Sequence, residues 1–285
     1  MQEEWNFGRS EEIIALSGEV LEQCYSAIEK WVIHFVPEPT WIFNTHGVHS
    51  ILIRLDCIVD QNEKLRIYEV EERPCGAGIV STFNPVFEQK LRQVKKTWPS
   101  FEAVISHRRK YTDDLDWIPP YGGNGSLVLV RAEPEEGEFH CFQPHSVSTI
   151  VNEGNKQYGV GMGLWASVTP ETFSENGVWK NPFCLKPSHG SKCQNLEIWH
   201  PEKKFKSGYG ISSRKRILET IEREGEMYLQ DFIEPMRVDG GYMIYRIYFG
   251  YNMEERRYEY IGGCYNIRPS FKIHGATDSI FGPVV

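Results

Sequence analysis

The chain has 285 residues, with 31 Lys and Arg against 39 Asp and Glu, so its formal net charge at pH 7 is −8. With 40% hydrophobic and 25% charged residues, the composition is that of a globular protein and excludes disordered and fibrous classes. A net acidic chain binds phosphate backbones poorly, so nucleic acid is not expected as a main partner.

The N-terminal sequence MQEEWNFGRSEE is acidic and polar, unlike a secretory signal. No stretch approaches the roughly 20 uninterrupted apolar residues that cross a bilayer. The 7 cysteines are scattered without the spacing of a disulfide framework, which is typical of reduced thiols. These observations predict a soluble cytoplasmic protein with no membrane partner.

Apolar residues recur at steps of three and four across residues 13–31, which predicts a helix. Glu11 and Glu12 would occupy its first turn, where negative charge complements the helix dipole. Residues 51–60 and 65–72 are two short runs rich in branched apolar side chains, separated by a polar turn. This pattern predicts a β-hairpin.

Further along the chain, Asn84 and Pro85 form a cap-and-proline start for a helix that extends to about Lys96. Residues 183–187 and 196–199 have the pattern of a second hairpin. Residues 212–224 predict an amphipathic helix that begins at a serine cap and ends at a glycine.

The C-terminal third, from residue 227 onward, is rich in aromatic strand formers, with turns predicted at residues 240–241 and 262–263. Helices mixed with antiparallel strands predict an α+β fold. We divide the chain into residues 1–144, with the first hairpin and substrate-side elements, and residues 145–285, with the nucleotide-binding elements. The two parts would form one composite catalytic unit.

Four charged residues of the first hairpin form a first candidate site. Arg54 and Asp56 are two apart on one strand, and so are Glu69 and Glu71 on the next, so each pair shares a face. Pairing of the strands would bring three carboxylates and one guanidinium together, a set of oxygen ligands that suits Mg²⁺. The alternative is a solvated hairpin face with cross-strand ion pairs.

Two lysines beside small-residue loops form a second group of candidates. Lys186 lies at the end of the apolar segment 183–187 and precedes the loop 188–195, where backbone N–H groups could contact phosphates. Lys156 precedes a glycine-dense stretch, residues 159–163. A surface hairpin turn and a flexible loop are the alternative interpretations.

Two arginines, Arg246 and Arg268, interrupt C-terminal strands that are otherwise aromatic and aliphatic. A charged side chain on a half-buried strand commonly has a partner, and arginine suits bidentate contact with phosphate or carboxylate. The alternative for either residue is a structural salt bridge.

The order of these motifs resembles that of ATP-grasp ligases, in particular the permuted branch that includes the synthetase domain of glutathionylspermidine synthase. The segments that carry the resemblance are RLD (54–56), YEVEERPCGAG (68–78), EGNKQYGVGMGLW (153–165), LKPSHGSKCQN (185–195), YLQDFIEP (228–235) and GGCYNIRPS (262–270). One departure is Glu71, which stands where that family has asparagine and adds a negative charge.

The resemblance implies a permuted ATP-grasp-like fold, with antiparallel sheets and packed helices that form a nucleotide cleft. It also implies ATP and Mg²⁺ as cofactors, and a small-molecule or peptide carboxylate and an amine as co-substrates. The reaction would be amide-bond formation through an acyl phosphate. Two alternatives remain: an ATP-grasp kinase that releases a phosphorylated small molecule, and a non-catalytic relative that binds a nucleotide or a partner.

The resemblance assigns roles residue by residue. The implied metal ligands are Asp56, Glu69 and Glu71. The implied phosphate-binding residues are Lys156, Lys186, Ser188, Gly190 and Ser191, and the implied adenine-side residues are Gln230, Asp231, Phe232 and Ile233. Arg54 and Arg268 would stabilise the transferring phosphoryl group.

Overall fold

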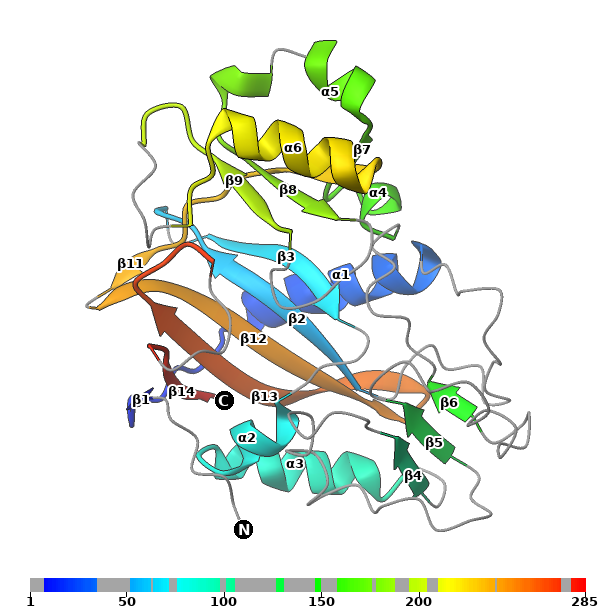
Figure 1. The fold of residues 1–285 in the computed structure, drawn as a ribbon. Helices are drawn as coiled ribbons and strands as arrows, with labels where there is room; N and C mark the ends of the chain where they lie inside the picture. Colours follow the sequence, from blue (N-terminus) through cyan, green and yellow to red (C-terminus); the bar gives the residue numbers. More distant parts are fainter. Residues whose placement is uncertain are drawn as a thin grey trace.

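The computed structural model describes residues 8–34, 52–62, 64–71, 76–97, 158–175, 178–187, 195–203, 210–238, 240–272 and 278–285. It also describes the backbone of a three-stranded parallel sheet, formed by β4 (Phe101–Ile105), β5 (Leu127–Val130) and β6 (Val147–Thr149). Two larger sheets and their helices build the rest of the described fold (Figure 1). The predicted α+β class is therefore confirmed.

The large sheet has the strand order β1-β14-β13-β12-β2-β3, with β11 paired to β12. Its members are β1 (Gly8–Arg9), β2 (Leu52–Val59), β3 (Leu65–Glu71), β11 (Arg237–Val238), β12 (Gly241–Asn252), β13 (Arg257–Arg268) and β14 (Ile280–Val284). The central strand β12 pairs with β2 on one side and β13 on the other. Strands from both sides of residue 144 therefore share one sheet.

One face of this sheet is apolar and packs against helix α1 (Gly18–His34), which crosses behind it in Figure 1. Trp31 of the helix and Leu55 of β2 are fully buried in this core. The alternate residues of β2, β3, β12 and β13 face the other way. One face thus supplies the core, and the opposite face is free to carry polar side chains.

The predicted start of the first helix is wrong, because α1 begins at Gly18 and not near Glu11. The preceding segment instead runs along β14, with the Ser10 N–H donating to Phe281 O at 2.7 Å and the Ile14 N–H donating to Pro283 O at 3.1 Å. The free edge of the sheet satisfies these backbone groups, so a helical turn is not needed there.

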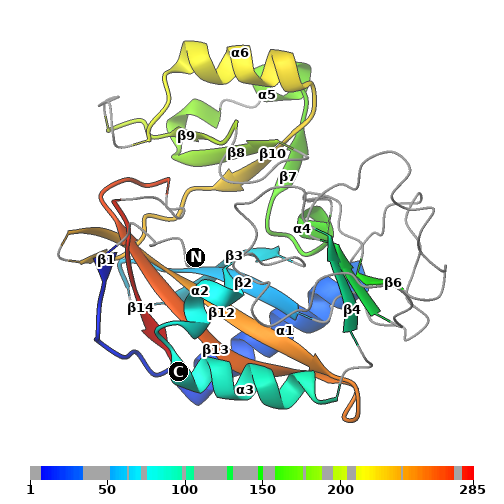
Figure 2. The ribbon, with the colours of Figure 1, turned by 60° about the horizontal axis from the view of Figure 1, so that its bottom comes forward.

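The opposite face of the large sheet is covered in two places. At one end lie α2 (Ala77–Ser81) and α3 (Pro85–Lys95), as Figure 2 shows. The predicted asparagine cap is present: Asn84 Oδ1 accepts from the Phe87 N–H at 3.0 Å. The same side chain donates to Gly263 O and Val284 O, each at 2.9 Å, and so fastens the helix to the sheet.

At the other end lies a four-stranded sheet with the order β7-β10-β8-β9. Its strands are β7 (Ala166–Val168), β8 (Phe183–Pro187), β9 (Glu197–Trp199) and β10 (Met227–Asp231). The other elements of this part are α4 (Tyr158–Gly161), α5 (Pro170–Glu175), the 3₁₀ turn Val178–Lys180 and α6 (Arg214–Glu224). The hairpins predicted at 51–72 and 183–199 are both antiparallel pairs, as expected.

The helix predicted at residues 212–224 is confirmed as α6, with the Ser213 side chain as its cap and Gly225 after its last residue. The turn predicted at Gly262–Gly263 is wrong, because both residues lie inside β13. Gly263 is needed for close approach: a Cβ there would lie 2.0 Å from Arg246 O on β12. Gly262 has φ +108°, beside a register shift between the two strands.

Among the described residues, Cys24, Cys57, Cys184 and Cys264 are buried free cysteines. No helix in the described part of the chain combines the length and the apolar character required for a membrane span.

The edge of β3 is completed by a side chain and not by another strand. Tyr158 Oη donates to Val70 O at 2.6 Å and accepts from the Val70 N–H at 3.0 Å. We expect Tyr158→Phe to lower the free energy of unfolding by about 1–3 kcal/mol, because both buried backbone groups lose their partner. Urea denaturation measures this, and a loss below about 0.5 kcal/mol would contradict it.

Candidate functional site

Charged and amide side chains gather where the small sheet meets the large one. In the register of the large sheet, Asp56 lies opposite Glu69 of β3 and opposite Arg246 of β12. Arg54 lies opposite Glu71. We call the following set the polar layer: Arg54, Asp56, Glu69, Glu71, Arg246 and Asn266 from the large sheet, and Lys186 and Gln230 from the small sheet. The large-sheet members share the face that is turned away from α1.

Arg54 is the best-buried cation on the large-sheet side of the polar layer, at 6% exposure. Its Nε and Nη2 donate to the two carboxylate oxygens of Asp56 at 2.6 and 2.9 Å, and Nη2 also donates to Glu71. Burial lowers the pKa of Arg54, but attraction to the two carboxylates outweighs it, so the pKa is raised. Arg54 is therefore a permanent positive charge beside two acids.

Glu71 and Glu69 have different environments although they lie on the same strand. Burial raises the pKa of Glu71, and although Arg54 opposes this, the neighbouring Asp56 and Glu69 carboxylates add to it. Glu69 instead accepts from Lys186 Nζ at 3.3 Å, across the junction of the two sheets. The contact joins residues 117 positions apart in the chain.

Lys186 comes from β8 and is 3% exposed. Its ammonium group lies 3.7 Å from the centre of the Tyr68 ring and 4.9 Å from that of Trp165. Two aromatic faces and one carboxylate thus hold the cation in place. The sequence-predicted hairpin carboxylates and the sequence-predicted lysine are brought together by the fold.

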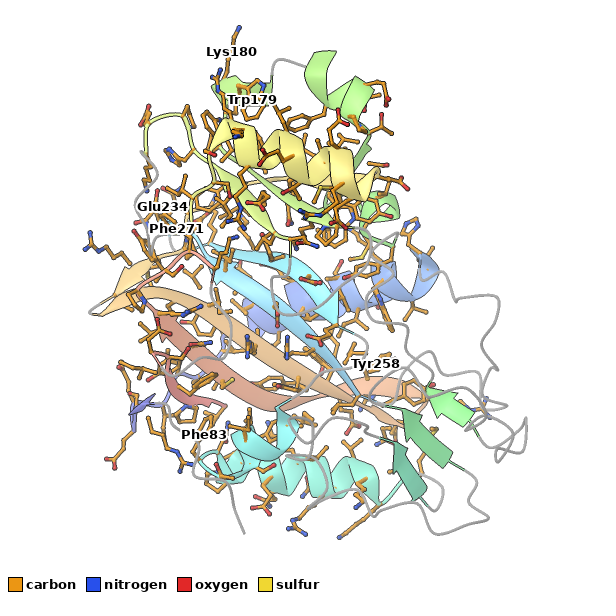
Figure 3. The ribbon with its side chains drawn as sticks, in the orientation of Figure 1. Phe83, Trp179, Lys180, Glu234, Tyr258 and Phe271 are labelled. Atoms are coloured by element: carbon orange, nitrogen blue, oxygen red, sulfur yellow. The ribbon has the colours of Figure 1, made fainter. Side chains whose placement is uncertain are left out.

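The four predicted adenine-side residues continue from β10 along the edge of the junction. Gln230 is 4% exposed and its Nε2 donates to Tyr68 O at 3.3 Å. Asp231 is exposed at the end of the strand, while Phe232 and Ile233 pack against the apolar cluster under the small sheet. At this end Lys203 Nζ lies 2.5 Å from Glu234 and 4.9 Å from the centre of the Phe271 ring; the last two residues are labelled in Figure 3.

Arg268, the second predicted catalytic arginine, is placed differently. Its Nε donates to Asp278 at 2.7 Å and its Nη1 to Lys272 O at 2.7 Å. The second arginine beside the carboxylates, after Arg54, is instead Arg246 of β12, which lies opposite Asp56 in the strand register. Sequence reasoning identified Arg246 as a charge within a strand but did not assign it to the site.

The remaining predicted phosphate-binding residues lie outside the described residues. These residues are Lys156, Ser188, Gly190 and Ser191.

Within the part of the chain that the structure describes, several buried polar atoms of the polar layer have no hydrogen-bond partner. They are Gln230 Oε1, Arg246 Nε and both amide atoms of Asn266. A buried polar atom without a partner costs about 1–3 kcal/mol, so such atoms are rare and call for an explanation. Their concentration at one junction is the arrangement expected of a binding site for a polar ligand.

The donor chemistry of the polar layer fits Mg²⁺, since Asp56, Glu69 and Glu71 offer hard oxygen ligands. Among the described residues, however, no group of three or more His, Cys, Asp and Glu side chains is arranged to hold a metal ion. Arg54 and Lys186 neutralise the carboxylates instead. This balance is compatible with Mg²⁺ only where substrate phosphates supply further ligands, which is how proteins usually bind it.

A comparison of the sequence with protein-family models gave no match. A comparison with curated proteins gave none either.

Proposed function

We propose that this protein is an ATP- and Mg²⁺-dependent carboxylate–amine ligase of the permuted ATP-grasp type. The observation that carries the proposal is the polar layer, in which a buried lysine of one sheet meets the carboxylates and arginines of the other. Cations of this kind complement a polyphosphate, and carboxylates complement the metal that accompanies it. The sequence resemblance assigned Arg54, Asp56, Glu69, Glu71 and Lys186 of this layer to phosphate and metal binding, but not Arg246 or Asn266.

In the proposed reaction a carboxylate oxygen attacks the γ-phosphorus of ATP, and the bond from that phosphorus to the bridging oxygen breaks to release ADP. The amine nitrogen then bonds to the acyl carbon, phosphate leaves, and the amine loses a proton to solvent. Catalysis of phosphoryl transfer depends mainly on position and charge neutralisation.

The residues of the chain would divide these tasks between the sheets. Lys186 would contact the phosphates and Gln230 the nucleobase, both from the small sheet. Arg54 would stabilise the transferring group from the large sheet. Asp56, Glu69 and Glu71 would hold Mg²⁺, which neutralises phosphate charge when it is bound. Junctions of this kind exclude water, which protects a reactive acyl phosphate.

The experiment is thermal unfolding with ATP, Mg²⁺, both or neither, followed by an assay of ADP release with acids and amines. Nucleotide at about 100 times its dissociation constant adds about 2.7 kcal/mol to native stability, a shift of several degrees. We expect a shift that needs ATP and Mg²⁺ together. No shift under any condition would overturn the proposal.

Asp56→Asn provides the matched variant, because it keeps the shape of the side chain and removes its charge. We expect ADP formation to fall at least about a hundredfold, the range reported for loss of one transition-state contact. Unchanged turnover would refute the role of Asp56 in the metal site.

One observation favours a second function, a relative that binds a nucleotide without catalysis. Arg54 already neutralises both Asp56 and Glu71, so these acids are satisfied without a metal. A thermal shift with ATP that is independent of Mg²⁺, with no ADP formed, would favour this second function.

A further inference from the structure

We infer that Asn266 and Arg246 form the recognition site for the acid co-substrate, and that this acid carries a hydroxyl or amino group next to its carboxylate. The inference rests on the proposed function, because it assigns a substrate class to the same site. The observation behind it is the set of buried polar atoms of Arg246 on β12 and Asn266 on β13 that have no hydrogen-bond partner among the described residues. The sequence resemblance assigned neither residue.

The two side chains are neighbours on the polar face of the large sheet. Arg246 pairs with Cys264 and Ile244 pairs with Asn266, so Asn266 is the diagonal neighbour of Arg246. Such diagonal residues lie within roughly 7–8 Å of each other, close enough for one small molecule to contact both. Arg246 also lies opposite Asp56 in the strand register. Arg246 and Asn266 are therefore directly beside the carboxylates.

A comparison of two buried asparagines shows why Asn266 is unusual. Asn84 and Asn266 are both 0% exposed. Asn84 accepts one hydrogen bond and donates two, whereas neither amide atom of Asn266 has a hydrogen-bond partner in the part of the chain that the structure describes. Because an unsatisfied buried amide is a cost to the fold, its presence is explained by a ligand that satisfies it.

The chemistry of the unpartnered atoms selects the ligand class. The Arg246 Nε–H and the Asn266 Nδ2–H groups are donors, which suits the oxygens of an anion. Asn266 Oδ1 is an acceptor, and it remains unsatisfied whichever way the amide is turned. A deprotonated phosphate offers only acceptors, so it would leave this oxygen without a partner. A 2-hydroxy or 2-amino acid offers both a carboxylate and an adjacent donor.

The residues around Asn266 indicate how the acid would be oriented. Asn266 lies between Ile244 of β12 and Phe281 of β14, both buried. Because these two neighbours of Asn266 are apolar, the carboxylate of the acid would be directed toward Arg246, and the carbon chain of the acid would extend along the sheet.

The first test compares Asn266→Leu with Asn84→Leu, two substitutions of similar volume at equal burial, in thermal unfolding without ligand. We expect Asn84→Leu to lower the unfolding temperature by at least about 4 °C, because it removes a cap and two further hydrogen bonds. We expect Asn266→Leu to leave it unchanged or to raise it. An equal loss in both variants would overturn the inference, since Asn266 would then be structurally satisfied.

The second test measures ADP release from Mg-ATP, with hydroxylamine as the trapping amine, for acids of matched chain length. The probes are propionate, lactate and alanine; succinate, malate and aspartate; and glutarate, 2-hydroxyglutarate and glutamate. We expect at least one hydroxy or amino acid to exceed its unsubstituted partner about tenfold or more. We expect Asn266→Leu to remove that preference and to raise the KM for the acid about ten- to hundredfold.

These outcomes separate the inference from the proposed function. A wild-type protein without an Mg-ATP thermal shift would contradict the ligase itself. A protein that binds Mg-ATP but responds equally to the matched acids, or to none of them, would overturn the inference alone. So would Asn266→Leu with an unchanged KM for the acid, whereas its Mg-ATP shift is expected to equal that of the wild type.

Discussion

Replacement of Arg54 by leucine is expected to lower the free energy of unfolding by about 1–3 kcal/mol at pH 7, because the neighbouring carboxylates of Asp56, Glu69 and Glu71 then repel one another without this counter-charge. Arg54 is 6% exposed and holds both Asp56 and Glu71. The measurement is urea denaturation of both proteins in the presence of a chelator, so that no metal replaces the lost guanidinium.

The free energy of unfolding that Arg54→Leu loses relative to the wild type, its stability deficit, should depend on pH. Without the guanidinium, nothing opposes the burial that raises the pKa of Glu71, so the folded-state pKa of this acid rises further above its unfolded value. An acid with a raised folded-state pKa binds its proton first in the folded protein, so stability increases as the pH falls. The deficit should therefore narrow from pH 7 toward about pH 5. In the wild type the same effect is smaller, because Arg54 opposes the burial that raises the pKa of Glu71.

A triple variant serves as the control for this result. Arg54→Leu combined with Asp56→Asn and Glu71→Gln removes two carboxylate charges along with their counter-charge. Most of the lost stability should return, since neutral side chains need no cation. A deficit that is independent of pH, or a triple variant as unstable as the single one, would contradict the assigned role of Arg54.

Local patterns were enough to predict the elements that carry most of the candidate site. The period of two along β2 and β3 indicated that Arg54 shares a face with Asp56, and Glu69 with Glu71. The strand register shows that the two pairs lie opposite each other. Cap residues likewise indicated α3 and α6. In these cases the residues that decide the structure are near one another in the chain.

Features that depend on distant partners were not predictable in this way. The contact of Lys186 with Glu69 requires the docking of two sheets, and no local pattern reports it. The segment before α1 has helical spacing, yet its backbone pairs with β14, at the other end of the chain. The tight approach at Gly263 similarly depends on β12, so a glycine pair typical of a turn lies inside a strand.

Asn266 was not predicted for the same physical reason, since its role depends on residues distant in the chain. A single asparagine in an aromatic strand has no local signal that distinguishes a structural amide from a functional one. The distinction becomes visible only when its burial and its lack of partners are known together. Arg246 gave a weak signal, since a charge within an apolar strand usually has a partner.

The substitution Lys186→Met is expected to impair nucleotide binding strongly while the fold is retained. Lys186 is the one cation of the described polar layer that the small sheet provides. Loss of its contacts with phosphate should weaken binding of Mg-ATP about ten- to hundredfold and reduce ADP formation about 10²–10³-fold. The measurements are a titration of the thermal shift and an ADP assay.

We expect Lys186→Met to keep or raise the stability of the protein, although it impairs nucleotide binding. Lys186 is 3% exposed, and methionine has a similar length without a charge that must be desolvated. Because Glu69 keeps 25% of its side chain exposed, water can replace the lost partner. The unfolding temperature of Lys186→Met should therefore be equal to that of the wild type or higher, in contrast to the loss expected for Arg54→Leu.

Lys90→Met is the matched control, because Lys90 Nζ also lies on a tyrosine ring, 4.7 Å from the centre of Tyr260, but belongs to α3 and not to the polar layer. It should leave Mg-ATP binding and ADP formation unchanged. Equal losses in the two variants would indicate a general effect of removing a lysine from an aromatic face. A Lys186→Met protein that binds Mg-ATP as tightly as the wild type would show that the nucleotide phosphates do not lie at the junction of the two sheets.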